Sequence, residues 1–204
     1  MTTDDRGVLL IVDVQNDFCP GGVLAVQGGD DIIPAVNRLA HSFAHVILTQ
    51  DWHPPGHTSF ASSHPGKRLF DTIQVSYGAQ ILWPDHCVQG TTGAAFHPKL
   101  DIPHAELVLR KGFRKSIDSY SAFCENDRRT VTGLAGYLRD RGLRRITLCG
   151  LATDFCVAFS AIDGRGAGLD VAVVTTACRG TDNDGSVDRA LRSMVDAGVR
   201  VHAE

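Results

Sequence analysis

The chain lacks a long apolar run, a strong excess of either charge and any low-complexity tract. Its longest apolar stretch, GVLLIVDV, is interrupted by Asp13 and is far too short to span a bilayer. The formal net charge is only -3 and no basic run occurs, so neither nucleic acid nor a membrane is indicated as a partner. The first residues, MTTDDRG, are acidic and polar, unlike an export signal. We therefore expect a cytoplasmic protein.

Two phosphate-binding loops are also absent. No GxGxxG follows the first apolar run, and neither GxxxxGKS nor GxxxxGKT occurs in the sequence. Both kinds of loop hold nucleotide phosphates against backbone N–H groups. Their absence argues against dinucleotide or triphosphate binding of that kind.

Closely spaced cysteine pairs are missing as well. Because no export signal is expected, we interpret the scattered cysteines as reduced thiols rather than as a disulfide framework. Five of them fit buried or incidental thiols: Cys19, Cys87, Cys124, Cys149 and Cys178. Cys156 differs because of where it lies in the chain.

Short apolar runs alternate with amphipathic segments along the 204 residues. Continuous apolar runs of this length are typical of strands buried on both faces of a parallel sheet. The alternation predicts an α/β fold, a three-layer α/β/α sandwich with a doubly wound, mainly parallel six-stranded sheet. We expect strands at 8–14, 45–50, 106–111, 145–150, 171–178 and 199–203, and helices at 30–44, 126–142, 153–168 and 184–198, three of them ending at Gly142, Gly168 and Gly198.

One long connection interrupts this alternation. We expect a single domain over residues 1–204, with an insertion at about 52–103 that is rich in Gly, Pro, Ser and His and has one brief apolar run, AQILW. A connection of this length inside a compact domain is usually either functional or disordered. The histidines favour function.

Three reactive side chains are expected at carboxyl ends of the predicted strands. Asp13 ends the first strand, Lys111 ends the third, and Cys156 follows the fourth by about one turn. Ligands of open parallel sheets bind at this edge. Thr153 is expected to be the N-cap of the following helix. Its free N–H groups and dipole would lower the pKa of Cys156 and stabilise an oxyanion.

These residues suggest nucleophilic catalysis. Cys156 would attack a carbonyl carbon, Lys111 would favour the thiolate, and Asp13 would carry the proton to a leaving amine. Each residue also has a structural interpretation: a core cysteine, a surface lysine and a helix-capping aspartate. Their shared position at one edge of the sheet favours the catalytic interpretation.

The insertion carries a candidate metal site. In TQDWHPPGHTSF, Asp51 and His53 are separated by one residue and point to the same side of an extended chain. His86 could complete an open set of ligands for Zn²⁺, Fe²⁺ or Mn²⁺, with His57 as a fourth ligand or a supporting group. The alternative is a solvated loop that happens to contain histidine.

Five motifs, in order, resemble the nicotinamidases of the isochorismatase-like hydrolase superfamily. They are DVQNDF, DWHPPGHTSF, ILWPDHCVQGTTGAAFHPKL, RKGFRKSIDSYSAF and GLATDFCV, and the resemblance runs from Val8 to about Thr181. It implies a Cys156, Lys111 and Asp13 triad.

The resemblance also implies how the rest of the site is built. The metal, most simply Zn²⁺ with Fe²⁺ or Mn²⁺ as alternatives, would be held by Asp51, His53 and His86. The oxyanion hole would use the backbone N–H groups of Ala152 and Cys156, with a cis peptide before Ala152. The implied ring pocket is lined by Phe18, Trp83, Tyr120 and, on weaker grounds, Leu24.

The implied reaction is hydrolysis of nicotinamide to nicotinate and ammonia in NAD salvage, with pyrazinamide converted to pyrazinoate in the same way. The partner would be this small-molecule substrate, and relatives that range from monomers to larger assemblies leave a homodimer open.

Four other functions are weighed against this one. The first is another cysteine amidase or carbamoyl hydrolase of the superfamily. In the second, the metal activates water and Cys156 is a bystander. The third is a non-catalytic binding protein on the same fold, against which the intact triad argues. Isochorismatase proper is the fourth, and its vinyl-ether hydrolysis needs no cysteine.

Overall fold

Parallel strands form the central sheet of the computed structural model, which describes residues 7–203. They are β1 (Gly7–Val12), β2 (His45–Asp51), β5 (Leu107–Lys111), β6 (Arg145–Leu151), β7 (Asp170–Arg179) and β8 (Arg200–His202). Their order is β5-β2-β1-β6-β7-β8, and every neighbouring pair is parallel. The predicted fold class is confirmed. Residues 1–6 lie outside the described residues, and with them most of the segment MTTDDRG, which we expect not to be an export signal.

The position of the central strand β1 explains why its residues are all apolar. All of β1, GVLLIV, is buried, and it pairs with β2 on one side and β6 on the other. A strand covered on both faces needs apolar side chains at every position rather than at alternate ones. β1 therefore lies in the middle of the core.

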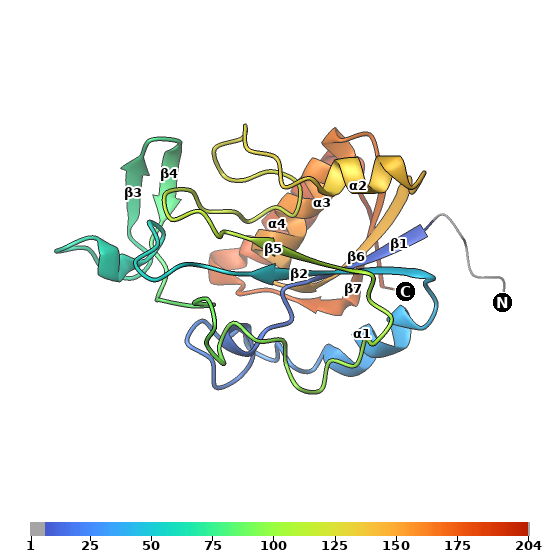
Figure 1. Ribbon diagram of the computed structural model, residues 1–204, viewed down its shortest axis with the longest axis horizontal. Coiled ribbons are helices and arrows are strands. Elements are labelled where there is room, and N and C mark those ends of the chain that lie inside the picture. The colour runs from blue at the N-terminus through green and yellow to red at the C-terminus, as the bar shows by residue number, and fades with distance from the viewer. Residues whose placement is uncertain (1–6, 204) are drawn as a thin grey trace.

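Helices cover both faces of the sheet (Figure 1). α1 (Ile33–Ala40) lies on one face, and α2 (Leu134–Asp140), α3 (Ala158–Gly166) and α4 (Ser186–Asp196) lie on the other. Gly142, Gly168 and Gly198 follow α2, α3 and α4 with positive φ angles of 70°, 82° and 82°, as predicted for helix C-termini.

α2 is shorter than predicted. The expected helix at 126–142 begins only at Leu134, because the Asp127 carboxylate accepts hydrogen bonds from the N–H groups of Arg129 and Thr130 and holds a turn there. Side-chain bonds of this kind compete with helix formation.

The insertion contains structure that the sequence did not reveal. β3 (Thr72–Val75) and β4 (Gly78–Ile81) form an antiparallel hairpin that projects from the carboxyl end of the sheet (Figure 1). The short helical turn η2 (Ala61–Ser63) also lies in the insertion, whereas η1 (Asn16–Phe18) follows β1 and η4 (Asn183–Gly185) precedes α4. The hairpin residues are mostly exposed or half-buried, so no apolar pattern marked them as strands.

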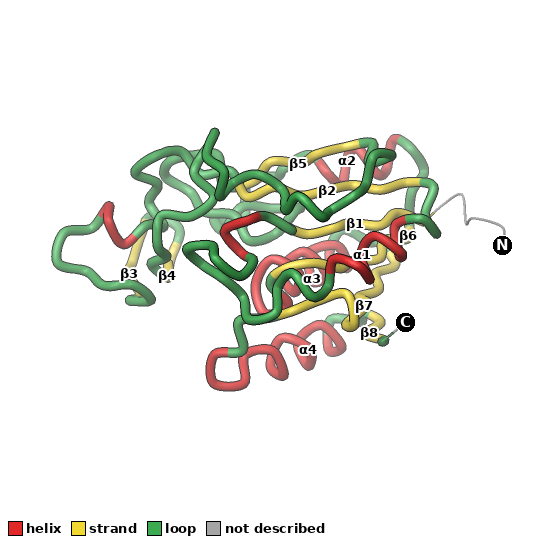
Figure 2. Tube along the Cα trace, turned by 90° about the horizontal axis from the view of Figure 1, so that it is seen from below, coloured by secondary structure: helices red, strands yellow, loops and turns green. Residues whose placement is uncertain are grey.

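The strand order places a switch point between β1 and β6. The chain moves from β1 to β2 in one direction and from β6 to β7 and β8 in the other. Loops gather at the carboxyl ends of these strands (Figure 2). Ligands of such sheets bind at this position. Among residues 7–203, no helix is long and apolar enough to cross a membrane.

Gly150 lets β6 approach β1 closely. Its φ angle is +118°, and a Cβ atom there would lie 2.1 Å from the carbonyl oxygen of Val12. No side chain fits, because the three nearest atoms all belong to the backbone of Val12 in the centre of the sheet.

We expect Gly150→Ala to lower the free energy of unfolding by about 3 kcal/mol, because it combines a forbidden backbone conformation with a clash in the core. Gly136→Ala is the matched control: Gly136 lies inside α2, where a Cβ would meet only the Arg139 guanidinium at 3.6 Å. That change should stabilise by about 0.5–1 kcal/mol. Urea denaturation measures both, and equal midpoints for the two variants would contradict this account of Gly150.

Asp154 ties the connection between β7 and α4 to the turn that follows β6. Its carboxylate accepts hydrogen bonds from the N–H and hydroxyl of Thr181 at 3.0 and 2.6 Å, from the N–H of Asp182 at 3.1 Å and from the hydroxyl of Ser186 at 2.5 Å. Burial opposes ionisation, but the bonds from Ser186 and Thr181 outweigh it and lower the pKa of Asp154.

Asp154→Asn should lower the free energy of unfolding at pH 7 by about 1–3 kcal/mol, because the amide nitrogen cannot accept these bonds. The folded pKa is lower than the unfolded one, so this stabilisation is complete above the usual carboxyl pKa of about 3.9 and is lost as pH falls through the folded value. Urea denaturation of both proteins at pH 7 and below pH 4 checks this. A difference that grows on acidification would refute it.

Candidate active site

Asp13 is fixed at the end of β1 by a threonine on β2. It is fully buried and has a positive φ of 48°. Its N–H donates to Thr49 Oγ1 at 3.1 Å, and the Thr49 hydroxyl donates to Asp13 Oδ1 at 2.6 Å. The other oxygen, Oδ2, lies 2.8 Å from Lys111 Nζ. Asp13 therefore presents one oxygen to the site.

The Lys111 ammonium group lies at the centre of the site, 1% exposed. Besides Asp13, its Nζ contacts Asp51 Oδ1 at 3.0 Å, the carbonyl oxygen of Ser119 at 3.1 Å and Cys156 Sγ at 3.3 Å. Burial favours the neutral amine, but Asp13 and Asp51 outweigh it and hold the pKa of Lys111 well above its usual range. Lys111 therefore carries a positive charge beside the sulfur.

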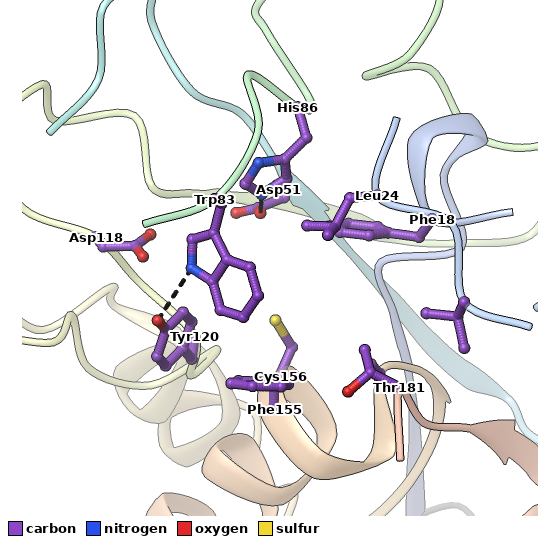
Figure 3. A pocket seen from close by; sticks show the side chains of 12 residues that line it. Phe18, Leu24, Asp51, Trp83, His86, Asp118, Tyr120, Phe155, Cys156 and Thr181 are labelled. Atoms are coloured by element: carbon purple, nitrogen blue, oxygen red, sulfur yellow. Dashed lines mark hydrogen bonds and ion pairs between the residues drawn. The ribbon is translucent and has the colours of Figure 1, made fainter. Parts of the chain in front are cut away.

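Cys156 lies in a π-helical turn, η3 (Thr153–Val157), that leads into α3. The prediction that Thr153 is the N-cap is wrong: Ala152 occupies the cap, and no side chain bonds the turn's N–H groups from that position. Helix-like backbone begins one residue earlier than expected because β6 ends at Leu151 and the wider turn starts at once. The sulfur points into a pocket between Trp83 and Phe18 (Figure 3).

The predicted lowering of the Cys156 pKa is also wrong. Burial raises the pKa of this thiol well above its usual value, and Lys111 only partly opposes the effect. Asp13 and Asp51 raise it further, and Asp13 also does so through a hydrogen bond with the thiol. The surroundings of Cys156 therefore raise the pKa of its thiol instead of lowering it.

Asp13 is suited to receive that proton. Burial raises the pKa of its carboxyl group, against the opposing influence of Lys111. A carboxylate with raised pKa is a better proton acceptor at neutral pH than an exposed one. Thiol, carboxylate and ammonium thus form a connected group in which a proton can move from Sγ to Asp13.

The segment before Cys156 has the backbone geometry that the resemblance implied. The peptide bond between Leu151 and Ala152 is cis. Ala152 and Cys156 both line the pocket.

Three candidate metal ligands converge beside this pocket. Asp51 Oδ2 lies 3.0 Å from His53 Nε2 and 3.4 Å from His86 Nε2, and all three residues are buried. The structure therefore brings together the predicted trio, although Asp51 and His53 come from the end of β2 and His86 from far along the insertion.

Neighbouring groups fix how these ligands point. His53 Nδ1 donates to the carbonyl oxygen of Gly112 at 2.9 Å, and His86 Nδ1 donates to that of Pro84 at 2.8 Å. Both rings therefore direct Nε2 at Asp51. Gln15 brackets the backbone of Asp51, accepting from its N–H at 2.8 Å and donating to its carbonyl at 2.9 Å. Supporting bonds of this kind are typical of metal sites.

The electrostatics of the trio favour a cation. Burial opposes ionisation of Asp51, but His53 and Lys111 hold its pKa well below the usual range. Burial likewise favours neutral His53, yet Asp51 raises its pKa. One carboxylate oxygen and the Nε2 atoms of two imidazoles form a ligand set that fits a divalent transition metal.

His57 does not face the trio. Its Nε2 donates to the carbonyl oxygens of Arg114 and Ile117 at 2.9 and 3.2 Å, and its Nδ1 accepts from the Ser59 hydroxyl at 2.7 Å. Its ring lies 4.3 Å from that of His53. Both nitrogens are engaged, so in this structure His57 packs behind a ligand instead of acting as one.

The pocket joins the two ends of the site. All four predicted wall residues, Phe18, Leu24, Trp83 and Tyr120, line it. Sequence reasoning missed Val26, Asp118, Phe155 and Thr181, which also line it. Phe155 could have been found as the neighbour of Cys156 and Asp118 by its place in the motif with Tyr120, whereas Val26 and Thr181 carry no local signal.

Comparisons with known proteins agree with this geometry. The model of the isochorismatase domain family matches residues 7–203. A curated nicotinamidase from Acinetobacter baylyi is 56% identical over 192 residues, covering 94% of this chain and 90% of the relative.

Solved structures are similarly close. A nicotinamidase/pyrazinamidase from Acinetobacter baumanii superposes with a TM-score of 0.97 at 52% identity, covering 98% of this chain and 97% of the other. A pyrazinamidase from Pyrococcus horikoshii in complex with zinc has a TM-score of 0.79 at 32% identity, covering 98% and 99% of the two chains. The chain belongs to the isochorismatase domain family.

Proposed function

We propose that this chain is a cysteine amidohydrolase that converts nicotinamide to nicotinate and ammonia, and pyrazinamide to pyrazinoate, in NAD salvage. One observation carries the proposal: Cys156, Asp51 and His86 line the same aromatic-walled pocket, and His53 lies beside Asp51 and His86. A flat ring amide with a ring nitrogen matches both ends. The names of the relatives, nicotinamidase and pyrazinamidase, support the same substrates.

The proposed roles of the triad follow from its contacts. Asp13 takes the proton of Cys156 as the sulfur attacks the amide carbon, and the carbonyl oxygen becomes an oxyanion facing the backbone N–H groups of Ala152 and Cys156. Asp13 then gives the proton to the leaving nitrogen, releasing ammonia and leaving a thioester. A water that loses a proton to Asp13 cleaves the thioester, and the proton returns to Cys156. Lys111 keeps a positive charge beside the sulfur throughout.

Asp51, His53 and His86 would hold one divalent transition metal, with Zn²⁺ as the first candidate and Fe²⁺ or Mn²⁺ as alternatives. Bound there, the ion supplies an electrophilic site for the ring nitrogen. The zinc complex of the related pyrazinamidase supports this choice. The bound metal would accelerate the reaction by positioning the ring relative to Cys156, since a fixed near-attack geometry lowers the barrier.

The remaining parts of the proposal concern organisation. We place the whole chain in a single domain, in which the insertion at about 52–103 contributes His86 and Trp83 to the site. We expect a cytoplasmic enzyme whose partner is its small-molecule substrate.

Another cysteine amidase or carbamoyl hydrolase of the superfamily is the second candidate. The aromatic walls argue against small aliphatic substrates, because Trp83, Tyr120 and Phe155 pack edge to face, with ring centroids 5.0–6.3 Å apart, into a flat-sided pocket. A substrate panel separates the two candidates.

Ammonia release from nicotinamide by the purified protein tests the proposal. We expect turnover of nicotinamide and pyrazinamide, and much slower turnover of benzamide, which has no ring nitrogen. Removal of metal by a chelator should suppress turnover, and Zn²⁺ should restore it. Asp51→Ala should lower bound metal and reduce kcat/KM by at least about 100-fold. Equal rates with nicotinamide and benzamide, or full activity without metal, would contradict the proposal that a metal at this site binds the ring nitrogen.

Cys156→Ala should reduce kcat by roughly 10⁴-fold or more, because no other group can form the thioester. Its metal content should match that of the wild type, since the sulfur is not among the three ligands. Cys124→Ala, a cysteine that does not line the pocket, is the control and should retain activity. Ammonia release near the wild-type rate from Cys156→Ala, or after alkylation with iodoacetamide, would favour the metal-activated-water mechanism instead.

A further inference from the structure

A buried amide outside the pocket connects several of the pocket's polar groups. Gln80 lies on β4 and is 1% exposed. Its Nε2 donates to the carbonyl oxygen of Ile81 at 2.7 Å, to Asp118 Oδ2 at 2.9 Å and to the Tyr120 hydroxyl at 3.3 Å. Two of these partners, Asp118 and Tyr120, line the pocket.

The orientation of this amide is determined by two oxygens that can only accept. A flipped amide would point its oxygen at the Ile81 carbonyl and the Asp118 carboxyl group, so Nε2 must face them. The Tyr77 hydroxyl then donates to Gln80 Oε1 at 2.8 Å and itself accepts from the N–H of Asp118 at 3.2 Å. Tyr77 therefore completes the bonding of the amide.

The wall continues from Tyr120 to the indole of Trp83. Trp83 Nε1 donates to the Tyr120 hydroxyl at 3.1 Å, as the dashed line in Figure 3 marks. The Tyr120 oxygen thus accepts from both Gln80 and Trp83. The other Asp118 oxygen, Oδ1, accepts from the N–H of Ser119 at 2.8 Å and lies 4.0 Å from His53 Nε2.

Gln80 is the one fully buried residue of β3 and β4. An apolar side chain there would be the simpler way to attach a hairpin to a domain, because a buried amide is unfavourable unless its polar atoms are bonded. Two of the four partners of Gln80, Tyr77 and Ile81, belong to the hairpin itself. The other two, Asp118 and Tyr120, lie outside the hairpin and line the pocket.

We propose that Gln80 is a positioning residue for the substrate wall: it bonds both the Asp118 carboxyl group and the Tyr120 hydroxyl, and so keeps Tyr120 and Trp83, whose rings meet edge to face, in place as walls of the pocket. This inference rests on the proposed amidohydrolase function and extends it to the β3–β4 hairpin. Without Gln80, the Asp118 oxygen loses its donor and can turn to the Tyr120 hydroxyl, which moves the ring wall. The triad of Asp13, Lys111 and Cys156 makes no contact with Gln80.

Gln80→Leu should therefore raise KM for nicotinamide about tenfold and leave kcat within about threefold of wild type, since the Asp118 and Tyr120 groups of the wall lose their buried donor while Cys156 and Lys111 keep theirs. The dissociation constant of nicotinate, measured by tryptophan emission, should rise by a similar factor. The chain contains only Trp52 and Trp83, so the pocket indole contributes strongly to that signal. Tyr77→Phe should shift KM in the same direction by a smaller factor.

Gln74→Leu is the matched control. Gln74 lies on β3 of the same hairpin and is exposed, so the same substitution there should leave KM, kcat and nicotinate binding at wild-type values. If Gln80→Leu does not fold, Tyr77→Phe and Gln80→Glu carry the test, and in both KM should rise.

The outcomes separate this inference from the function on which it rests. An active wild type whose Gln80 variants keep wild-type KM and nicotinate binding would overturn the role of Gln80 alone. So would a loss of kcat and stability with KM unchanged, because that pattern describes a purely structural residue. A wild type that releases no ammonia from nicotinamide would remove the proposed function, and this inference with it.

Discussion

The buried ammonium group of Lys111 is the interaction on which the site depends. It lies 2.8 Å from Asp13 and 3.0 Å from Asp51, and neither carboxylate is exposed to solvent enough to be stable without it. Removing one partner of such a buried group leaves an uncompensated charge, which is strongly unfavourable. Lys111 therefore joins the proton-carrying carboxylate and the metal-binding carboxylate into a single structure, so the two ends of the pocket are electrostatically coupled.

This coupling bears on the proposed use of the Cys156 thiol. Burial raises the pKa of Cys156, and the two neighbouring carboxylates raise it further. In the proposed mechanism the positive charge of Lys111, 3.3 Å from the sulfur, and the nearby Asp13 would make transfer of the proton accompany attack rather than precede it. The turn that carries the cysteine favours a low pKa, whereas burial and the neighbouring carboxylates determine the direction of the shift.

The walls of the pocket come from segments that the sheet alone does not position. Trp83 and His86 are in the insertion, Tyr120 follows β5, and Thr181 follows β7. Hydrogen bonds across these segments hold them in place, as with Asp154 and the connection before α4, and with Gln80 between Asp118 and Tyr120. The strand ends and the turn after β6 thus carry the proposed reacting groups, while loops joined by hydrogen bonds form the walls of the pocket.

The sequence by itself determined the sheet, the ends of three helices and the residue types that meet at the strand ends. Uninterrupted apolar strands such as GVLLIV and glycines such as Gly142 act locally, and chain order then places Asp13, Lys111 and Cys156 at one edge. Only the tertiary structure decided the start of the turn at Thr153, the pKa direction of Cys156, the orientation of His57 and the network around Gln80. Each of these depends on contacts between residues far apart in the chain, and burial and hydrogen bonding at such contacts have no signature in local sequence.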